Sequence, residues 1–329
     1  MITAADEFLH LDAAPIPGAL FVDTTWFSVM DVQANLFGVV QVSLSNHGYA
    51  RWSSLFQIDG VLQCWGNKHA FDGTPPRGPW GDGRMRFEVV RPLEEFRVTY
   101  DGPLYAYDLG FAARYPAFEY DHSASGEQLT ESNPYFSMVW GGHFEQAMDC
   151  RGRFEIRGGP ARGQVRGIAC RSHRERSWMH NFHEEKEWQR SDEPLFPGHF
   201  WLILHLEDAQ ICALGSPRGS RLGMPTVGAL SDGRGARPLR SVAAEVVLDD
   251  SGTTATEFRF ALELPDGRRM RARSTRKLGE VKLWYRGDNC LDNPVDCYEA
   301  FCEFELDDGQ RCQGICEYSI HPARRRWLA

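Results

Sequence analysis

The chain has 329 residues, of which 42% are hydrophobic and 12% aromatic, so it can bury one large core or two ordinary ones, and we favour two domains. The 36 Lys and Arg against 45 Asp and Glu leave a net charge of −9, which disfavours nucleic acid or an anionic membrane as a partner because either would need a basic face. Asp6, Glu7 and Asp12 interrupt the N-terminal region, and no run of about 18 apolar residues occurs. We therefore expect a cytoplasmic protein without a membrane span.

Two β-rich blocks, residues 26–65 and 85–111, are followed by a strand-like run over residues 135–148. Short stretches of alternating apolar and polar residues are separated by turn signals such as Asp59-Gly60 and Asp82-Gly83, which is typical of a β-meander. Residues 157–163, rich in Gly, Pro and Arg, are predicted to separate two halves. We place the domains at residues 1–162 and 163–329.

Two hairpins are predicted in the C-terminal half. Residues 256–264 return through Pro265-Asp266-Gly267 as residues 268–275, and residues 298–306 return through Asp307-Asp308-Gly309 as residues 310–320. In the second hairpin the period of two predicts a core face with Tyr298, Ala300, Cys302, Phe304 and Leu306, and a largely solvated face with Glu299, Phe301, Glu303 and Glu305. No βαβ alternation or Gly-rich phosphate loop is present, so an all-β fold is expected.

The nine cysteines include five in the C-terminal region: Cys290, Cys297, Cys302, Cys312 and Cys316. The count is odd and lacks Cys-x-x-Cys spacing, so in a reducing compartment we interpret them as small buried hydrophobic residues. Zinc would favour thiolates clustered in tight turns. We expect neither a metal site nor a cofactor.

The densest chemical segment covers residues 171–184 and combines Arg, His, Glu, Ser and Trp. It indicates either a site or an Arg–Glu network that ties the halves together with Trp178 as a packing anchor. His180, His183 and Glu184 do not have zincin spacing, and no Gly-x-Ser-x-Gly elbow supports a nucleophilic pair of Ser177 with His173. Both of these readings are disfavoured.

A second segment, Gly141-Gly142-His143-Phe144-Glu145-Gln146-Ala147, follows an aromatic run that ends at Trp140. On a strand, His143 and Glu145 point the same way, so an imidazole and a carboxylate can converge on one bound molecule. Phe136, Met138, Trp140, Phe144 and Met148 would lie on the opposite face.

These segments carry a family resemblance. His143-Phe144-Glu145-Gln146, Gly152, Arg174-Glu175-Arg176-Ser177-Trp178, Asp308-Gly309 and Glu317-Tyr318 follow one another in an order that resembles the AttH-like superfamily. This superfamily includes hydroxyneurosporene synthase, the carotenoid hydratase, and is similar to kievitone hydratase of fungi. The chain departs from the family pattern with Glu175 in place of Asp, Met179 in place of Gly and Asn181 in place of Arg. The resemblance implies two lipocalin-like, calycin-type antiparallel β-barrels in tandem.

The resemblance also implies cofactor-free chemistry, in which water adds across an isoprenoid double bond. Such a reaction needs a proton donor, a wall that tolerates a cation and a positioned water. A carboxyl group in an apolar pocket can stay protonated near neutral pH. We expect Glu175 or Glu145 to supply the proton and His143 and His173 to orient it or the water. Trp140, Trp178, Arg174, Gln146 and Tyr318 are the expected substrate-binding residues.

The leading hypothesis is a hydratase, cyclase or isomerase acting on a terpenoid- or polyketide-like molecule in a cavity between or within the barrels. The alternative is a non-catalytic carrier of an apolar ligand, as single lipocalin barrels commonly are. A third reading is an interaction protein with purely structural motifs. A homodimer remains open in all three cases.

Overall fold

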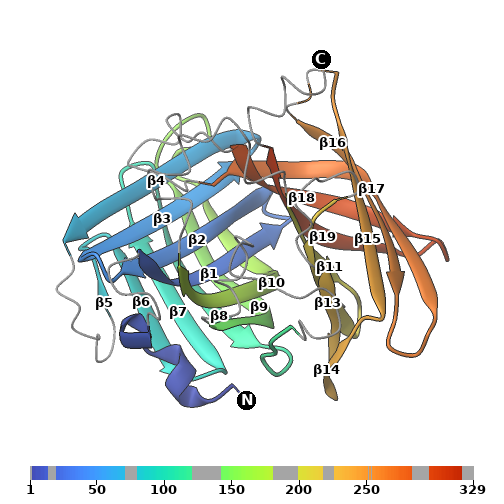
Figure 1. The fold of residues 1–329 in the computed structure, drawn as a ribbon. Helices are drawn as coiled ribbons and strands as arrows, with labels where there is room; N and C mark the ends of the chain where they lie inside the picture. Colours follow the sequence, from blue (N-terminus) through green and yellow to red (C-terminus); the bar gives the residue numbers. More distant parts are fainter. Residues whose placement is uncertain are drawn as a thin grey trace. The chain divides into compact units, whose positions relative to one another are not determined.

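The computed structural model describes residues 2–13, 20–70, 80–120, 142–180, 199–217, 226–250, 252, 254–283 and 296–320. Among them, the residues through Glu119 and from Gly142 to His180 form one compact unit, and those from His199 onward form a second. Each unit is built on one antiparallel sheet that curls into a lipocalin-like β-barrel (Figure 1). The all-β expectation and the two tandem lipocalin-like halves are confirmed. The described residues include no helix long and apolar enough to cross a membrane.

The first unit begins with two short 3-10 helices and continues with a sheet of ten strands in the order β4-β3-β2-β1-β10-β9-β8-β7-β6-β5. The elements are η1 (Ala4–Glu7), η2 (Leu11–Ala13), β1 (Phe21–Asp31), β2 (Leu36–Ser45), β3 (Tyr49–Ile58), β4 (Val61–Ala70), β5 (Trp80–Gly81), β6 (Met85–Arg91), β7 (Glu95–Asp101), β8 (Tyr105–Ala113), β9 (Gly142–Ile156) and β10 (Val165–His180). Consecutive strands pair within β1–β4 and within β5–β10, and the long-range pair β1–β10 joins these two meanders.

The second unit contains nine strands in the order β14-β13-β12-β11-β19-β18-β17-β16-β15. They are β11 (Phe200–His205), β12 (Ala209–Gly215), β13 (Val227–Asp232), β14 (Gly235–Pro238), β15 (Ser241–Leu248), β16 (Ala255–Glu263), β17 (Arg269–Lys282), β18 (Asp296–Leu306) and β19 (Arg311–Ile320). Four strands form a first meander, five form a second, and β11–β19 joins them as β1–β10 does in the first unit. The two units are thus topological repeats.

The interior of the first barrel is filled by aromatic side chains. Phe56 on β3 contacts Tyr105 and Tyr107 on β8 at ring distances of 5.8 and 5.6 Å. The Tyr105 hydroxyl donates to the carbonyl of Ser54 at 2.8 Å, which ties β8 to β3 across the interior. On β4 the Asn67 amide donates to Asp82, beside β5, at 2.6 Å, so side chains link the two edges of the curled sheet.

The predicted C-terminal hairpins are confirmed as β16–β17 and β18–β19. Ala300, Cys302, Phe304 and Leu306 lie in the core of the second unit as expected. The opposite face of β18 is not largely solvated, because Glu299 and Phe301 are completely buried, while Glu303 is partly exposed. This face carries its own buried polar groups.

The expected domain boundary near residue 162 falls in the turn between β9 and β10, which are paired strands of one sheet. Gly159 and Gly163 have φ angles of 72° and 88°, a conformation that suits glycine at a tight turn. The Gly- and Pro-rich composition therefore serves a hairpin, and the first unit continues to His180. Residues 171–180 form the end of β10.

Candidate acid-base site

The β9–β10 hairpin aligns the two segments that the sequence singled out. Its pairs are symmetric about residue 160, so that Glu145 faces Glu175, and His143 faces Ser177. Phe144 and Met148 point into cores of the unit, which confirms that His143 and Glu145 lie on the opposite face of the sheet.

All four predicted catalytic residues come together on that face. The His143 Nε2 atom lies 3.3 Å from Glu145 Oε1 and 3.4 Å from Glu175 Oε1. The other oxygen of Glu145 contacts Nε2 of His173. Imidazoles and carboxylates therefore alternate in the order His173, Glu145, His143, Glu175. We call this group the acid-base row.

The acid-base row is buried at one end and accessible at the other. The side chains of His173 and Glu145 are completely buried and that of His143 is 6% exposed, whereas that of Glu175 is 16% exposed. Burial alone would lower the pKa of His143, but the neighbouring carboxylates, Glu145 first and then Glu175, raise it above its ordinary value. The protonated form of the imidazole is thus favoured directly behind the most accessible carboxyl group.

The geometry of the row suits proton transfer more than metal binding. Its donor atoms follow one another in sequence and do not surround one point, as metal ligands do. Trp26 on β1 faces Glu175 in the sheet register, and its ring lies 6.4 Å from that of His173. An indole therefore stands beside the acid groups, where it can stabilise positive charge.

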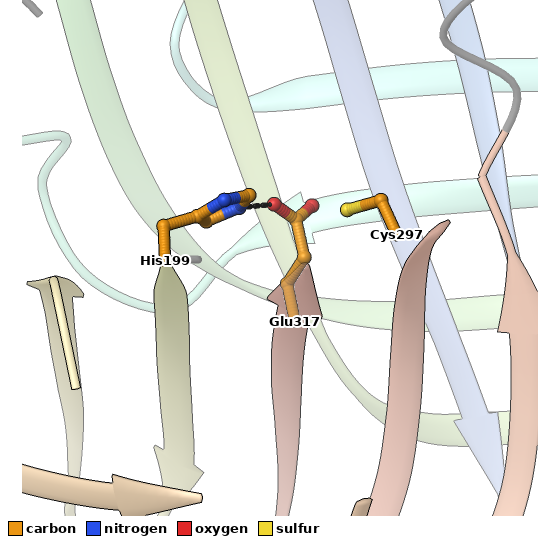
Figure 2. A group of neighbouring side chains, drawn as sticks. All are labelled: His199, Cys297 and Glu317. Atoms are coloured by element: carbon orange, nitrogen blue, oxygen red, sulfur yellow. Dashed lines mark hydrogen bonds and ion pairs between the residues drawn. The ribbon is translucent and has the colours of Figure 1, made fainter. Parts of the chain in front are cut away.

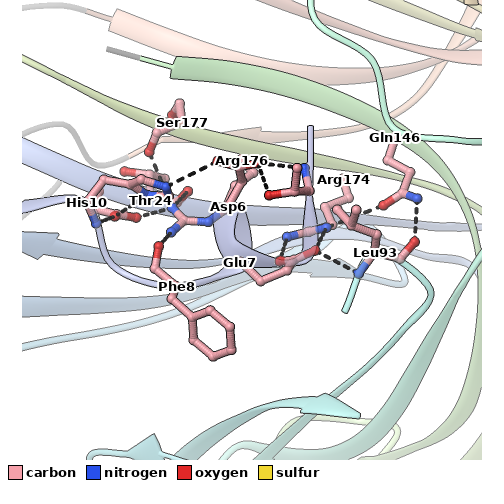
Figure 3. A network of polar contacts seen from close by, with 12 residues as sticks. Asp6, Glu7, Phe8, His10, Thr24, Leu93, Gln146, Arg174, Arg176 and Ser177 are labelled. Atoms are coloured by element: carbon pink, nitrogen blue, oxygen red, sulfur yellow. Dashed lines mark hydrogen bonds and ion pairs between the residues drawn. The ribbon is translucent and has the colours of Figure 1, made fainter. Parts of the chain in front are cut away.

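Arg174 and Gln146, two expected substrate-binding residues, point to the other face of the sheet. Arg174 is completely buried, donates through Nη1 to Glu7 at 2.9 Å and contacts the second oxygen of Glu7 through Nη2 (Figure 3). Its guanidinium lies 4.0 Å from the ring centre of Phe96. Gln146 accepts from Arg174 at 3.3 Å and donates to the carbonyl of Leu93 at 2.7 Å. These contacts give both residues a structural role inside the barrel.

Arg176 and Trp178 fix the N-terminal segment to the same face of β10. Arg176 pairs with Asp23 and donates to the carbonyl of Phe8 at 3.0 Å, and the His10 amide donates to Asp23 at 2.8 Å (Figure 3). Burial would raise the pKa of Asp23, but the charge of Arg176 and the hydrogen bonds from His10 and Arg176 hold it below its usual value. Trp178 stacks on His10 at 3.7 Å. The expected ion-pair network with Trp178 as a packing residue is therefore present, but these contacts lie within the first unit and not between two halves.

The remaining expected substrate-binding residues lie elsewhere. Tyr318 belongs to the core of the second unit, where its hydroxyl donates to Glu280 at 2.9 Å and accepts from the Ala255 amide at 3.2 Å. Trp140 lies outside the described residues, as do His183 and Glu184 of the disfavoured metal reading.

Sequence reasoning missed Trp26 and the partners Glu7 and Asp23, because long-range contacts place them. For the second unit the sequence holds a usable signal, because two spacings of polar residues from the first unit occur again there. Cys297-Tyr298-Glu299 repeats the spacing of His143-Phe144-Glu145, and Glu317-x-Ser319 repeats Glu175-x-Ser177.

The fold and the row define a two-barrel, lipocalin-like protein with a buried acid-base cluster. The family model described as Domain of unknown function (DUF7064) matches residues 3–322, and the chain belongs to this family. The structure is similar to that of kievitone hydratase from Nectria haematococca, with a TM-score of 0.54, 13% identity, and coverage of 97% of this chain and 94% of the other.

Two structures of CghA are also similar. For the complex with Sch210972 the TM-score is 0.54 and the identity 11%, and the match covers 92% of this chain and 88% of the other. For CghA alone the TM-score is 0.53 and the identity 10%, and the match covers 92% of this chain and 87% of the other. A comparison with curated protein sequences finds no match. The resemblance to the AttH-like and kievitone hydratase group is confirmed at the level of the fold.

Proposed function

We propose that this protein is an enzyme of the hydratase, cyclase or isomerase type that uses the acid-base row to protonate an apolar small molecule. The observation that carries the proposal is the position of His143, whose raised pKa favours its protonated form, between buried Glu145 and partly exposed Glu175. The similarity in fold to a protein named as a hydratase supports an enzyme.

In this mechanism Glu175 is the group that meets the substrate. Glu145 and Glu175 are directly opposed on neighbouring strands, and Nε2 of His143 lies within 3.4 Å of one oxygen of each, so the imidazole can carry a proton between them. His143 passes its proton to Glu175, which delivers it to a carbon–carbon double bond of the substrate. The resulting cation is captured by water, whose surplus proton returns to the Glu175 carboxylate, or by a second double bond, after which loss of a proton to Glu175 completes the cyclisation; direct loss of a proton from a neighbouring carbon gives an isomer.

The other members of the row are positioning residues. Glu145 keeps His143 charged, and His173 holds Glu145 in place from the buried end. The Trp26 indole is the aromatic group beside the row that would face a developing cation. The reaction requires no redox chemistry, and a terpenoid- or polyketide-like polyene fits its demand for a double bond.

The test is incubation of the purified full-length chain with a panel of prenylated and polyene compounds, followed by mass spectrometry. Hydration adds the mass of one water, and cyclisation or isomerisation leaves the mass unchanged while the retention time shifts. We expect Glu175→Gln to lower kcat by about 10²- to 10⁴-fold, the usual contribution of a general acid.

Glu155→Gln is the matched control, because Glu155 lies further along β9 on the same face as Glu145 and is partly exposed. It should leave turnover unchanged. Tight binding of a panel compound without any product would favour the carrier reading. Full turnover by a folded Glu175→Gln variant would overturn the assignment of the proton donor.

A further inference from the structure

The topological repeat places a second polar cluster in the second unit, at the positions that hold the acid-base row in the first. Strands β11, β19 and β18 correspond to β1, β10 and β9. In the first sheet the register aligns Trp26, Glu175 and Glu145, and in the second it aligns Trp201, Glu317 and Glu299. The same three residue types therefore occupy the same three strands in both units.

The two clusters differ at the neighbouring positions. Cys297, two residues before Glu299, takes the place of His143, and His199, two residues before Trp201, takes the place of Thr24. An imidazole from the residue that precedes β11, a thiol from β18 and a carboxyl group from β19 are thus collected on one face of the second sheet.

These three side chains point toward one another. One donor atom from each of His199, Cys297 and Glu317 lies within 4.8 Å of the other two, and Nε2 of His199 contacts Oε1 of Glu317 (Figure 2). Cys297 is completely buried, and His199 and Glu317 are each 8% exposed. Among the described residues, this is the group of His, Cys, Asp and Glu side chains whose donor atoms converge in this way.

We propose that His199, Cys297 and Glu317 bind a divalent metal ion of borderline softness, with Zn²⁺ as the best match. Imidazole nitrogen, thiolate sulfur and carboxylate oxygen are the three donor types that zinc takes in proteins. Three protein ligands leave a fourth tetrahedral position for water or a substrate atom, which is the arrangement of catalytic and not of purely structural zinc.

Ser319 provides the supporting contact that such a site needs. Its hydroxyl lies 2.7 Å from Nδ1 of His199 and also accepts from the His199 amide at 3.1 Å. Ligating histidines are oriented in this way through the ring nitrogen that does not bind the metal. The Nε2 atom is then directed at Glu317, on the side where Cys297 lies.

The other cysteines of these strands distinguish the position of Cys297. Cys302 and Cys316 point to the opposite face, into the apolar core, where burial raises the pKa of Cys302 to about 12 and that of Cys316 well above its ordinary value. Those thiols stay protonated and act as small hydrophobic residues. Cys297 shares its face with a histidine and a glutamate, and its thiol proton passes to solvent when the metal binds.

The experiment uses the untagged full-length chain, reduced, stripped of metal with a chelator and then titrated with Zn²⁺ or Co²⁺. We expect one ion per chain and, with Co²⁺, the near-ultraviolet absorption of a thiolate-to-cobalt transition. Cys297→Ser should abolish this absorption, and Ser319→Ala should weaken Zn²⁺ binding about 10- to 100-fold, as loss of a ligand-orienting contact does.

Cys312→Ser is the matched control, because Cys312 lies on β19 but packs at the core. It should bind both ions as the unmodified chain does. Glu175→Gln should also bind them normally, so the metal proposal and the proposed function can fail separately. Absence of stoichiometric binding to the unmodified chain, or unchanged cobalt absorption in Cys297→Ser, would overturn the proposal.

Discussion

Replacing Glu7 by glutamine removes the carboxylate that neutralises Arg174 inside the first barrel. Arg174 is completely buried and Glu7 is 8% exposed, and Glu7 also accepts from the Leu93 amide at 2.9 Å. Removing one partner of a buried ion pair costs about 3–5 kcal/mol, because the other charge is left without compensation. Glutamine keeps the volume and one acceptor oxygen, so we expect about 3 kcal/mol, or roughly a hundredfold in the folding equilibrium.

The assay is urea unfolding of the full-length chain combined with hydrogen exchange of peptides from β1 and β10. Glu94→Gln is the control, because Glu94 pairs with Arg91 at 2.8 Å but is 61% exposed, and its loss should change the free energy of unfolding by at most about 0.5 kcal/mol. The double variant Glu7→Gln with Arg174→Met should recover much of the loss, since the stranded charge is gone. Equal effects of Glu7→Gln and Glu94→Gln would refute the reasoning.

Three further changes test other parts of the first unit. Because the pKa of His143 is raised above 6.5 in the folded chain, protonation of its imidazole stabilises the fold. This contribution is complete below about pH 6.5 and is lost as the pH rises through the folded-state pKa. In urea titrations at several pH values, the difference in free energy of unfolding between the unmodified chain and His143→Gln should therefore shrink as the pH rises. Tyr105→Phe removes the hydroxyl that donates to the Ser54 carbonyl and should cost about 0.5–1.5 kcal/mol by the same assay, and an unchanged free energy of unfolding would contradict the contact between β3 and β8. Gly152→Ala would drive a Cβ into the Asp108 carbonyl of β8 and should lower the free energy of unfolding by about 1–3 kcal/mol, whereas Gly167→Ala, where the added Cβ meets open space, is the control.

Local patterns were sufficient for much of this architecture. Period-two alternation correctly assigned the faces of β9 and β18 that pack into the barrel cores. It failed for Glu299 and Phe301, since alternation distinguishes two faces but does not say whether the second one is also covered. The hairpins at Pro265-Asp266-Gly267 and Asp307-Asp308-Gly309 followed from turn chemistry alone.

The convergence of the acid-base row depended on one turn. Residues 157–163 combine glycine, proline and arginine, a composition that suits both a linker and a hairpin. Interpreted as a hairpin centred on residue 160, the same residues align Glu145 with Glu175 without any further information. The pairings β1–β10 and β11–β19 connect segments far apart in the chain, and the docking of Glu7 on Arg174 spans 167 positions. No local pattern specifies contacts of that kind.

The position of the polar clusters follows from how each barrel is filled. In the first unit, Phe56, Tyr105, Tyr107 and Phe154 contact one another across the interior, and Arg174 is used to hold the N-terminal segment there. A binding reading that places an apolar ligand inside this barrel must displace that packing. The row of His173, Glu145, His143 and Glu175 lies on the other face of the same strands, outside that aromatic core. The two sheets share a register of Trp, Glu and Glu, but the second has Cys297, His199 and Ile315 where the first has His143, Thr24 and His173. On this argument the two clusters are variants of one arrangement built on a shared sheet register.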